Sequence, residues 1–177
     1  IMSIIHQGFS YQRRLTIVEG LRSTDIVQII TDLPHLTGMI EAIPDEGSLR
    51  PETYFYTYAT PRDDLINRMQ QTQQIALAEA WINRPKDLPY KTPQDALIMA
   101  SIIEKEASVN ADRRLVAAVL VNRLKRGMRL QSDPTVLYEA TTSPQSPIPI
   151  TTTHLKTKTP WNTYVIRGLP KTPICNP

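Results

Sequence analysis

The chain has 177 residues, of which 41% are hydrophobic and 21% charged, which is enough for one ordinary core or for one domain with a fragment of another. Its net charge of +3 is mild, and its basic residues do not cluster with aromatic ones, so the composition argues against a nucleic-acid partner. A single cysteine, Cys175, excludes an internal disulfide, and the isolated histidines His6, His35 and His154 lack the spacing of metal ligands.

Both ends of the sequence look cut, so we interpret the chain as a fragment of a longer protein. The sequence contains neither a signal peptide nor an apolar run that could cross a membrane. In a fragment, this says little about the compartment in which the protein works.

The first sixty residues predict a small strand–turn–helix unit followed by an extended segment. The β-branched stretch 15–18 predicts a strand, Gly20 a turn, and Ser23 the cap of a helix with an isoleucine-rich face. This unit is too short to bury its own core, so it must belong to a larger module or pack on the rest. Tyrosines alternate at positions 54, 56 and 58, which is typical of a half-buried strand face or of a sugar-stacking edge.

The remainder predicts mainly helices. We expect a long helix over 61–84, whose "QQTQQ" segment (70–74) is interpreted as a solvated face, and a proline-rich linker after it. Further helices are expected from Pro93, after Asn110 and from Ser132 or Asp133. Short strands are expected at 128–131 and 162–170, and a loop at 141–153. The fold class is therefore α+β, with helices carrying most of the core.

Two acids interrupt the apolar segment "LIMASIIEKEASV" (97–109), and their helical neighbours differ. At i±3 and i±4, Glu104 has only alanines and serines, whereas Glu106 has Ile102, Ile103 and Val109. We therefore expect Glu104 beside open space that a closely packed helix or a ligand fills. We expect Glu106 to be enclosed, paired with Arg113 or Arg114, or else to emerge at the helix edge. A structural acid paired with an arginine is the alternative for Glu104.

A carboxyl group in apolar surroundings resists ionisation, which is the property that a general acid requires near neutral pH. Glycoside cleavage usually uses two carboxyl groups that flank the bond. Asp133 and Glu46 are the candidates for a second acid, although their spacing in sequence does not show whether either lies close to Glu104.

Three blocks of the second half resemble the endolytic murein transglycosylases, the YceG-like family: "ALIMASIIEKEA", "VAAVLVNRLKRGMRLQSDPTVLY" and "TPWNTYVIRGLP". A weaker block is "EGSLRPETY", and residues 1–33 resemble the end of a LysM-like subdomain. By this resemblance residues 34–177 form a transglycosylase catalytic domain that stops before the final segment of the family. Arg50, Trp161 and Glu139 depart from the residues usual at their positions.

The resemblance implies cleavage of the MurNAc–GlcNAc β-1,4 bond within glycan strands of peptidoglycan, leaving 1,6-anhydro-MurNAc ends. The catalytic glutamate of the family falls on Glu104. The resemblance also implies a substrate cleft lined by Glu46, Glu106, Gln131, Asp133, Thr135, Asn162 and Tyr164. No metal or cofactor is implied.

The same resemblance implies a protein of the cytoplasmic (inner) membrane. Its single anchoring helix would lie outside this chain, its catalytic domain on the periplasmic or extracytoplasmic side, and its partners would include cell-wall synthases. Two alternatives remain: a non-catalytic peptidoglycan-binding module and an aminodeoxychorismate lyase. The lyase needs a pyridoxal phosphate lysine and a phosphate cradle, and although Lys105 is present, the sequence has no glycine-rich phosphate loop.

Overall fold

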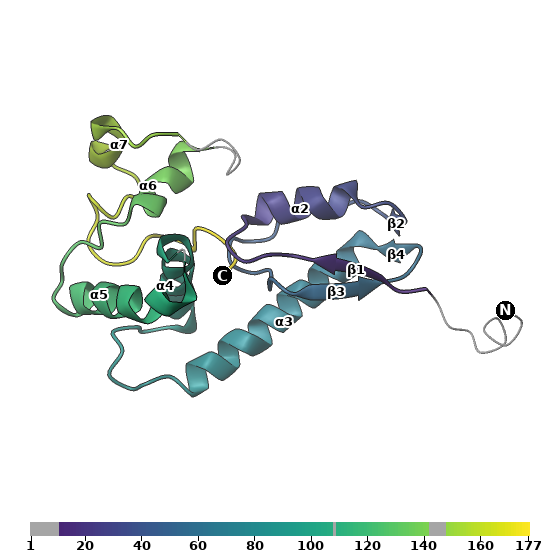
Figure 1. Cartoon of the computed structure of the whole chain (residues 1–177), viewed down its shortest axis with the longest axis horizontal. Helices are drawn as coiled ribbons and strands as arrows, with labels where there is room; N and C mark the ends of the chain where they lie inside the picture. Colours follow the sequence, from purple (N-terminus) through teal and green to yellow (C-terminus); the bar gives the residue numbers. More distant parts are fainter. Residues whose placement is uncertain (1–10, 108, 142–147) are drawn as a thin grey trace, which may run out of the picture.

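The fold is α+β, as predicted from the sequence, and its helices outweigh its strands. In this computed structural model the described residues are 11–107, 109–141 and 148–177. Two small sheets, one helix and the start of a long helix form one half, and four shorter α-helices with one 3-10 helix form the other (Figure 1). None of the helices in these parts of the chain has both the length and the hydropathy needed to cross a bilayer.

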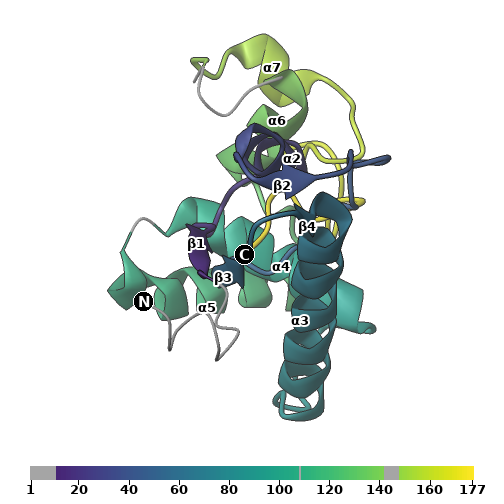
Figure 2. The ribbon, with the colours of Figure 1, turned by 90° about the vertical axis from the view of Figure 1, so that its right-hand side faces the viewer.

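The first half is built on two antiparallel strands, β1 (Arg13–Thr16) and β3 (Thr53–Tyr56). Helix α2 (Ser23–Asp32) and the start of α3 (Arg62–Ile82) both pack on the same face of this pair, the face that carries Leu15, Tyr54 and Tyr56 (Figure 2). The opposite face is open in the described part of the chain, and its Phe55 is 52% exposed. Strands β2 (Leu36–Thr37) and β4 (Thr60–Pro61) form a second, parallel pair. The shared core consists mainly of Leu15, Ile17, Ile26, Ile30, Leu49, Tyr54, Tyr56, Leu65, Ile66 and Met69.

Two of the three alternating tyrosines fit the predicted strand face. Tyr54 and Tyr56 are 7% and 6% exposed, whereas Tyr58 lies beyond the strand and is 72% exposed. The first core extends from Leu15 to Met69, so the strand–helix unit is completed by β3 and α3. The division of the chain after residue 33 stays a prediction.

The second half consists of α4 (Pro93–Glu106), the short 3-10 helix η1 (Asn110–Asp112), α5 (Arg113–Lys125), α6 (Asp133–Ala140) and α7 (Thr152–Lys156). Its core joins Ile98, Met99 and Ile102 of α4 to Leu120, Leu130 and Ile174. Figure 2 shows α3 as a long rod that passes beside α4.

The two short strands predicted in the second half are wrong. At 128–131 the carbonyl of Leu130 accepts a hydrogen bond from the Arg123 guanidinium, and Gln131 has a positive φ of 54°, so the backbone does not pair with a strand. At 162–170 the amides of Val165 and Ile166 both donate to the carbonyl of Asn162, 3.0 Å away, which makes successive turns. The predicted loop 141–153 is wrong at its end, where α7 begins at Thr152; positions 142–147 lie outside the described residues.

The C-terminal segment connects the two halves, and its end lies between them in Figure 1. The amide of Asn176 donates to the carbonyl of Leu21, and the amide of Gly20 donates to the carbonyl of Asn176, both over 2.8 Å. Gly47 has a φ of +81°, and a Cβ atom there would lie 2.8 Å from Pro173, so this close approach requires glycine. The loop that carries Glu46 is thereby fixed against the C-terminal segment.

Candidate active site

Helix α4 is fixed at its start and presents both acids in its last turn. Thr92 accepts a hydrogen bond from the amide of Asp95 (3.2 Å), and the Asp95 carboxylate accepts one from the amide of Thr92 (3.1 Å). Residues two positions apart on a helix differ by about 200° in direction. Glu104 and Glu106 therefore lie on different faces of α4.

Glu104 lines a groove of about 340 Å³ between α3 and α4. Its side chain is only 12% exposed. The other residues that line the groove are Arg50, Gln73, Ala76, Leu77, Ala80, Ala96, Leu97, Ala100, Ile103, Arg113 and Pro177. The groove is thus mainly apolar with a few polar groups, and its volume lies in the usual range of ligand sites, roughly 300–1,000 Å³.

Arg113 holds the Glu104 carboxylate. Its Nη2 atom lies 3.0 Å from Oε1 and 2.8 Å from Oε2, so one nitrogen contacts both oxygens. Arg113 is the first residue of α5 and its side chain is 41% exposed. Arg113 therefore pairs with Glu104, as the alternative of an arginine-paired acid described, and not with Glu106, for which the sequence had suggested it.

The small residues beside Glu104 face two different neighbours. Ala100 lines the groove, whereas Ser101 is covered by the C-terminal segment, whose Ile174 amide donates to the Ser101 hydroxyl (3.0 Å). The Cys175 thiol donates to the Ser101 carbonyl (3.4 Å), and burial raises the pKa of this thiol to about 12. Only part of the space that the sequence predicted is therefore open to a ligand.

Glu106 is exposed, so the expectation that aliphatic side chains enclose it is wrong, and the alternative that it emerges at the helix edge describes its position. The Ser132 hydroxyl donates to its Oε1 atom (2.6 Å), and nearby the Tyr164 hydroxyl donates to Asp133 Oδ1 (2.5 Å). The hydrogen bond to Asp133, partial burial and the negative charges of Asp133 and Glu106 raise the pKa of Tyr164 to about 12. We call Glu106, Ser132, Asp133 and Tyr164 the Glu106 cluster.

Thr135 and Asn162 have mainly internal contacts. Thr135 is fully buried, donates to the Ser132 carbonyl (2.6 Å) and shares a hydrogen bond with Thr163 (2.8 Å). Asn162 is 1% exposed, and its side-chain nitrogen donates to the carbonyls of His154, Leu155 and Thr157. Both side chains therefore hold the backbone around α6 and α7.

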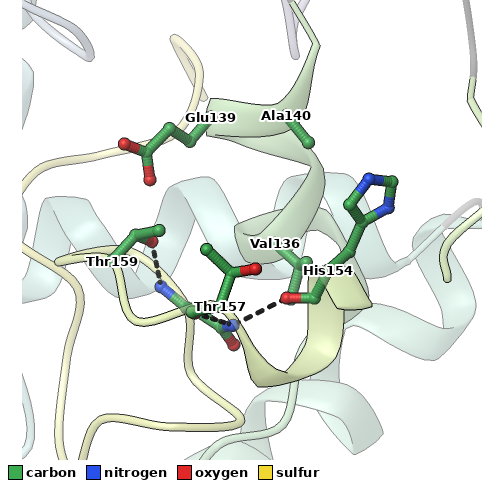
Figure 3. Close-up of a pocket in the computed structure, with 7 residues that line it drawn as sticks. Val136, Glu139, Ala140, His154, Thr157 and Thr159 are labelled. Atoms are coloured by element: carbon green, nitrogen blue, oxygen red, sulfur yellow. Dashed lines mark hydrogen bonds between the residues drawn. The ribbon is translucent and has the colours of Figure 1, made fainter. Parts of the chain in front are cut away.

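A second cavity, of about 310 Å³, lies beside Asn162 between α6 and α7. Figure 3 shows Val136 and Glu139 of α6 together with His154 of α7 and with Thr157 and Thr159 of the segment that follows α7. Gln131 is exposed and lines a further hollow, with Arg126 and Arg167. None of Gln131, Asp133, Asn162 and Tyr164 lines the Glu104 groove, so the structure does not bring them to Glu104 as expected.

Glu46 occupies a third position, at the junction of four segments. Its Oε1 atom accepts from the Ser23 amide (2.9 Å) and from Asn176 Nδ2 (3.1 Å), and its Oε2 atom accepts from the Tyr138 hydroxyl (3.2 Å). Burial raises the pKa of Glu46 above its ordinary 4.5, while the hydrogen bonds from Ser23 and Tyr138 and the charge of Arg22 act against that shift. Glu46 thus joins α2, the 45–49 loop, α6 and the C-terminal segment.

Sequence reasoning missed three polar residues of the groove. Arg113 was considered for the wrong acid, and Arg50 stood out only as a departure from the family pattern. Gln73 belongs to the "QQTQQ" segment interpreted as solvated, yet it is 4% exposed, which corrects that interpretation. Among the described residues no cluster of three or more histidine, cysteine or acidic side chains could hold a metal ion.

Comparison with known proteins identifies the family of this chain. The sequence matches the YceG-like family over residues 1–177. The chain belongs to the YceG-like family. An endolytic murein transglycosylase from Bacillus subtilis (strain 168) is 38% identical over 136 residues, which are 75% of this chain and 36% of that protein. Another, from Streptococcus pneumoniae (strain D39 / NCTC 7466), is 37% identical over 94 residues, 52% of this chain and 16% of that protein.

A solved structure supports the same family. The 2.6 Å crystal structure of a yceG-like protein from Listeria monocytogenes superposes with a TM-score of 0.74 at 29% identity, covering 98% of this chain and 66% of that one. This YceG-like chain therefore spans about a third of the length of its Bacillus relative and two thirds of the solved chain.

Proposed function

We propose that this chain is the catalytic part of an endolytic murein transglycosylase that cleaves the MurNAc–GlcNAc β-1,4 bond within glycan strands. The observation that carries the proposal is Glu104, a carboxylate that is 12% exposed and lines a groove of about 340 Å³. The names of the relatives support the same activity.

In the proposed reaction Glu104 acts twice. Its carboxyl group first protonates the glycosidic oxygen while the bond from C1 to that oxygen breaks. The C6 hydroxyl of the same MurNAc then attacks C1, and its proton returns to Glu104, so no water is consumed. A nucleophile within the same sugar has a high effective concentration and outcompetes water.

Arg113 fits this scheme as the residue that orients the acid. Its Nη2 atom contacts both carboxylate oxygens, and its side chain is 41% exposed, so it is free to leave one oxygen as the glycosidic oxygen approaches. The N-acetyl group of the substrate stabilises the positive charge that develops at C1. We also propose that Glu106, Gln131, Asp133 and Tyr164 contact more distant sugars of the strand, because Glu106, Gln131 and Asp133 are exposed and Tyr164 donates to Asp133.

The proposal extends to the whole protein. A membrane anchor outside this chain, an extracytoplasmic catalytic domain and contacts with cell-wall synthases are proposed from the family alone.

Digestion of purified sacculi by the full-length protein, followed by mass analysis of the new ends, tests the reaction. Anhydro ends, lighter by one water than hydrolysed ends, are expected. Only reducing ends would instead identify a hydrolase with a second catalytic carboxylate. No cleavage, with binding retained, would favour a peptidoglycan-binding module.

A further inference from the structure

The Glu104 groove carries more positive than negative charge. Its charged lining residues are Arg50, Arg113 and Glu104. Because Arg113 is paired with Glu104, the charge of Arg50 is the one that the groove itself does not neutralise. A ligand that carries an anionic group would neutralise the charge of Arg50.

The Arg50 side chain is held at its base and largely free at its end. The Arg50 amide donates to the Met69 carbonyl (3.2 Å), and the Arg50 carbonyl accepts from the Tyr54 hydroxyl (2.8 Å), so the backbone is fixed on the first core. The guanidinium contacts Glu52 through Nε alone, over 3.4 Å, and the two side chains are 38% and 50% exposed. An exposed pair of this kind contributes little, so Glu52 competes weakly for Arg50.

A second polar group of the groove also lacks a partner. Gln73, on α3, is 4% exposed, and its Oε1 atom has no hydrogen-bond partner within the described residues. A buried polar atom without a partner requires an explanation such as a ligand or an ordered water. The groove therefore combines a cation that is paired only weakly, with the exposed Glu52, and a buried amide oxygen that has no partner in the described residues.

We infer that Arg50 determines specificity in the Glu104 groove by binding a carboxylate of the substrate. This inference rests on the proposed function. In a peptidoglycan strand the carboxylates belong to the peptide stems attached to the MurNAc residues. A guanidinium binds a carboxylate through two parallel N–H groups, and the Nη atoms of Arg50 are not engaged by any described residue. The enzyme should therefore prefer strands whose stem carboxylates are free over strands in which they are amidated.

The test compares two glycan fractions of equal length, one with free stem carboxylates and one with those carboxylates converted to primary amides. We expect wild-type kcat/KM to be roughly tenfold to hundredfold higher on the free carboxylates, the range expected for a charge-assisted hydrogen bond. Arg50→Leu should abolish this preference, mainly by raising KM for the strand with free carboxylates. Arg50→Lys should keep part of the preference.

The matched control is Arg14→Leu, which removes the same charge from an exposed position on β1 outside the groove. This variant should keep the full preference, which separates local recognition from general attraction of an anionic polymer. Equal wild-type rates on the two fractions, or an undiminished preference in Arg50→Leu, would overturn the inference.

Affinity measurements keep this test independent of catalysis. Equilibrium dialysis with Glu104→Gln, which retains the groove, should show tighter binding of the carboxylate fraction, and adding Arg50→Leu should remove the difference. A wild type that cleaves neither fraction would overturn the proposed function. The affinity comparison would then still decide the role of Arg50, because equal affinities for the two fractions contradict it.

Discussion

The two acids at the end of α4 stand two residues apart and have opposite surroundings. Glu104 is 12% exposed, lies in a largely apolar groove and is held by the Arg113 guanidinium. Glu106 is exposed, accepts a hydrogen bond from the Ser132 hydroxyl and lies beside a second acid, Asp133, and Tyr164. One helix turn thus supplies two kinds of carboxylate, one enclosed in an apolar groove, where we propose proton transfer, and one open to solvent.

Replacing each acid in turn by glutamine tests this difference between Glu104 and Glu106 most directly. Glu104→Gln should lower the rate of glycan cleavage by roughly a hundredfold to ten-thousandfold, because an amide cannot donate and recover the proton. Glu106→Gln should cost much less, because its partner is a hydroxyl that can also bond to an amide. Release of anhydro ends from sacculi, measured with folded samples of both variants, provides the test. Equal losses in the two variants would remove the distinction between the acids.

The second prediction concerns Asn162, which the family resemblance places with the substrate but whose contacts are internal. Asn162→Ala removes hydrogen bonds to three backbone carbonyls, so we expect the free energy of unfolding to fall by about 1–3 kcal/mol. Asn83→Ala is the control, because Asn83 donates to one carbonyl at an exposed position. Urea unfolding measures both. A stable Asn162→Ala protein that has lost glycan binding would instead support the substrate role.

The third prediction addresses the Glu106 cluster. If the cluster contacts distant sugars, Tyr164→Phe should raise KM by roughly threefold to tenfold and leave kcat unchanged, because it removes one hydrogen bond outside the reacting centre. The control is Tyr58→Phe, which alters a side chain that is 72% exposed. A fall in kcat in Tyr164→Phe would place this cluster at the chemistry and contradict the separation of the two faces.

Much of this architecture was accessible from the sequence because its signals are local. Proline at the start of α4 and α6, and apolar spacing along α2 and α3, placed the long helices within a few residues. The strands predicted at 128–131 and 162–170 failed because their backbone groups make other hydrogen bonds. The Arg123 guanidinium donates to the Leu130 carbonyl, and the amides of Val165 and Ile166 donate to the Asn162 carbonyl in turns. Local composition does not report such contacts.

The candidate site was only partly predictable, for a related reason. Small neighbours on one helix indicated that Glu104 borders space, and the groove is there. Glu104 pairs with Arg113 because of the way α5 is placed after η1, and Gln73 is buried because α3 packs against α4. The sequence of a single helix does not determine how that helix packs against another. The role of Glu46 as a junction became visible only with Asn176, 130 residues away in the chain.

The last prediction uses Glu46, the third acid, whose effect should be on stability and not on catalysis. Its pKa in the folded protein is raised above the ordinary 4.5 by burial, so the folded state holds the proton more tightly than the unfolded state does. Between pH 4.5 and the raised pKa the folded state binds more protons, so this group makes stability decrease as pH rises. Glu46→Gln has no such proton, and it should gain stability relative to wild type as pH rises through that window.

Urea unfolding at several pH values, with the exposed Glu41→Gln as control, measures the difference. Parallel curves for wild type and Glu46→Gln would show that hydrogen bonds from Ser23, Tyr138 and Asn176 fully offset the cost of burial. Glu46 would then join Glu106 as a carboxylate whose charge the fold accommodates, and the contrast would be between Glu104 and every other acid considered above.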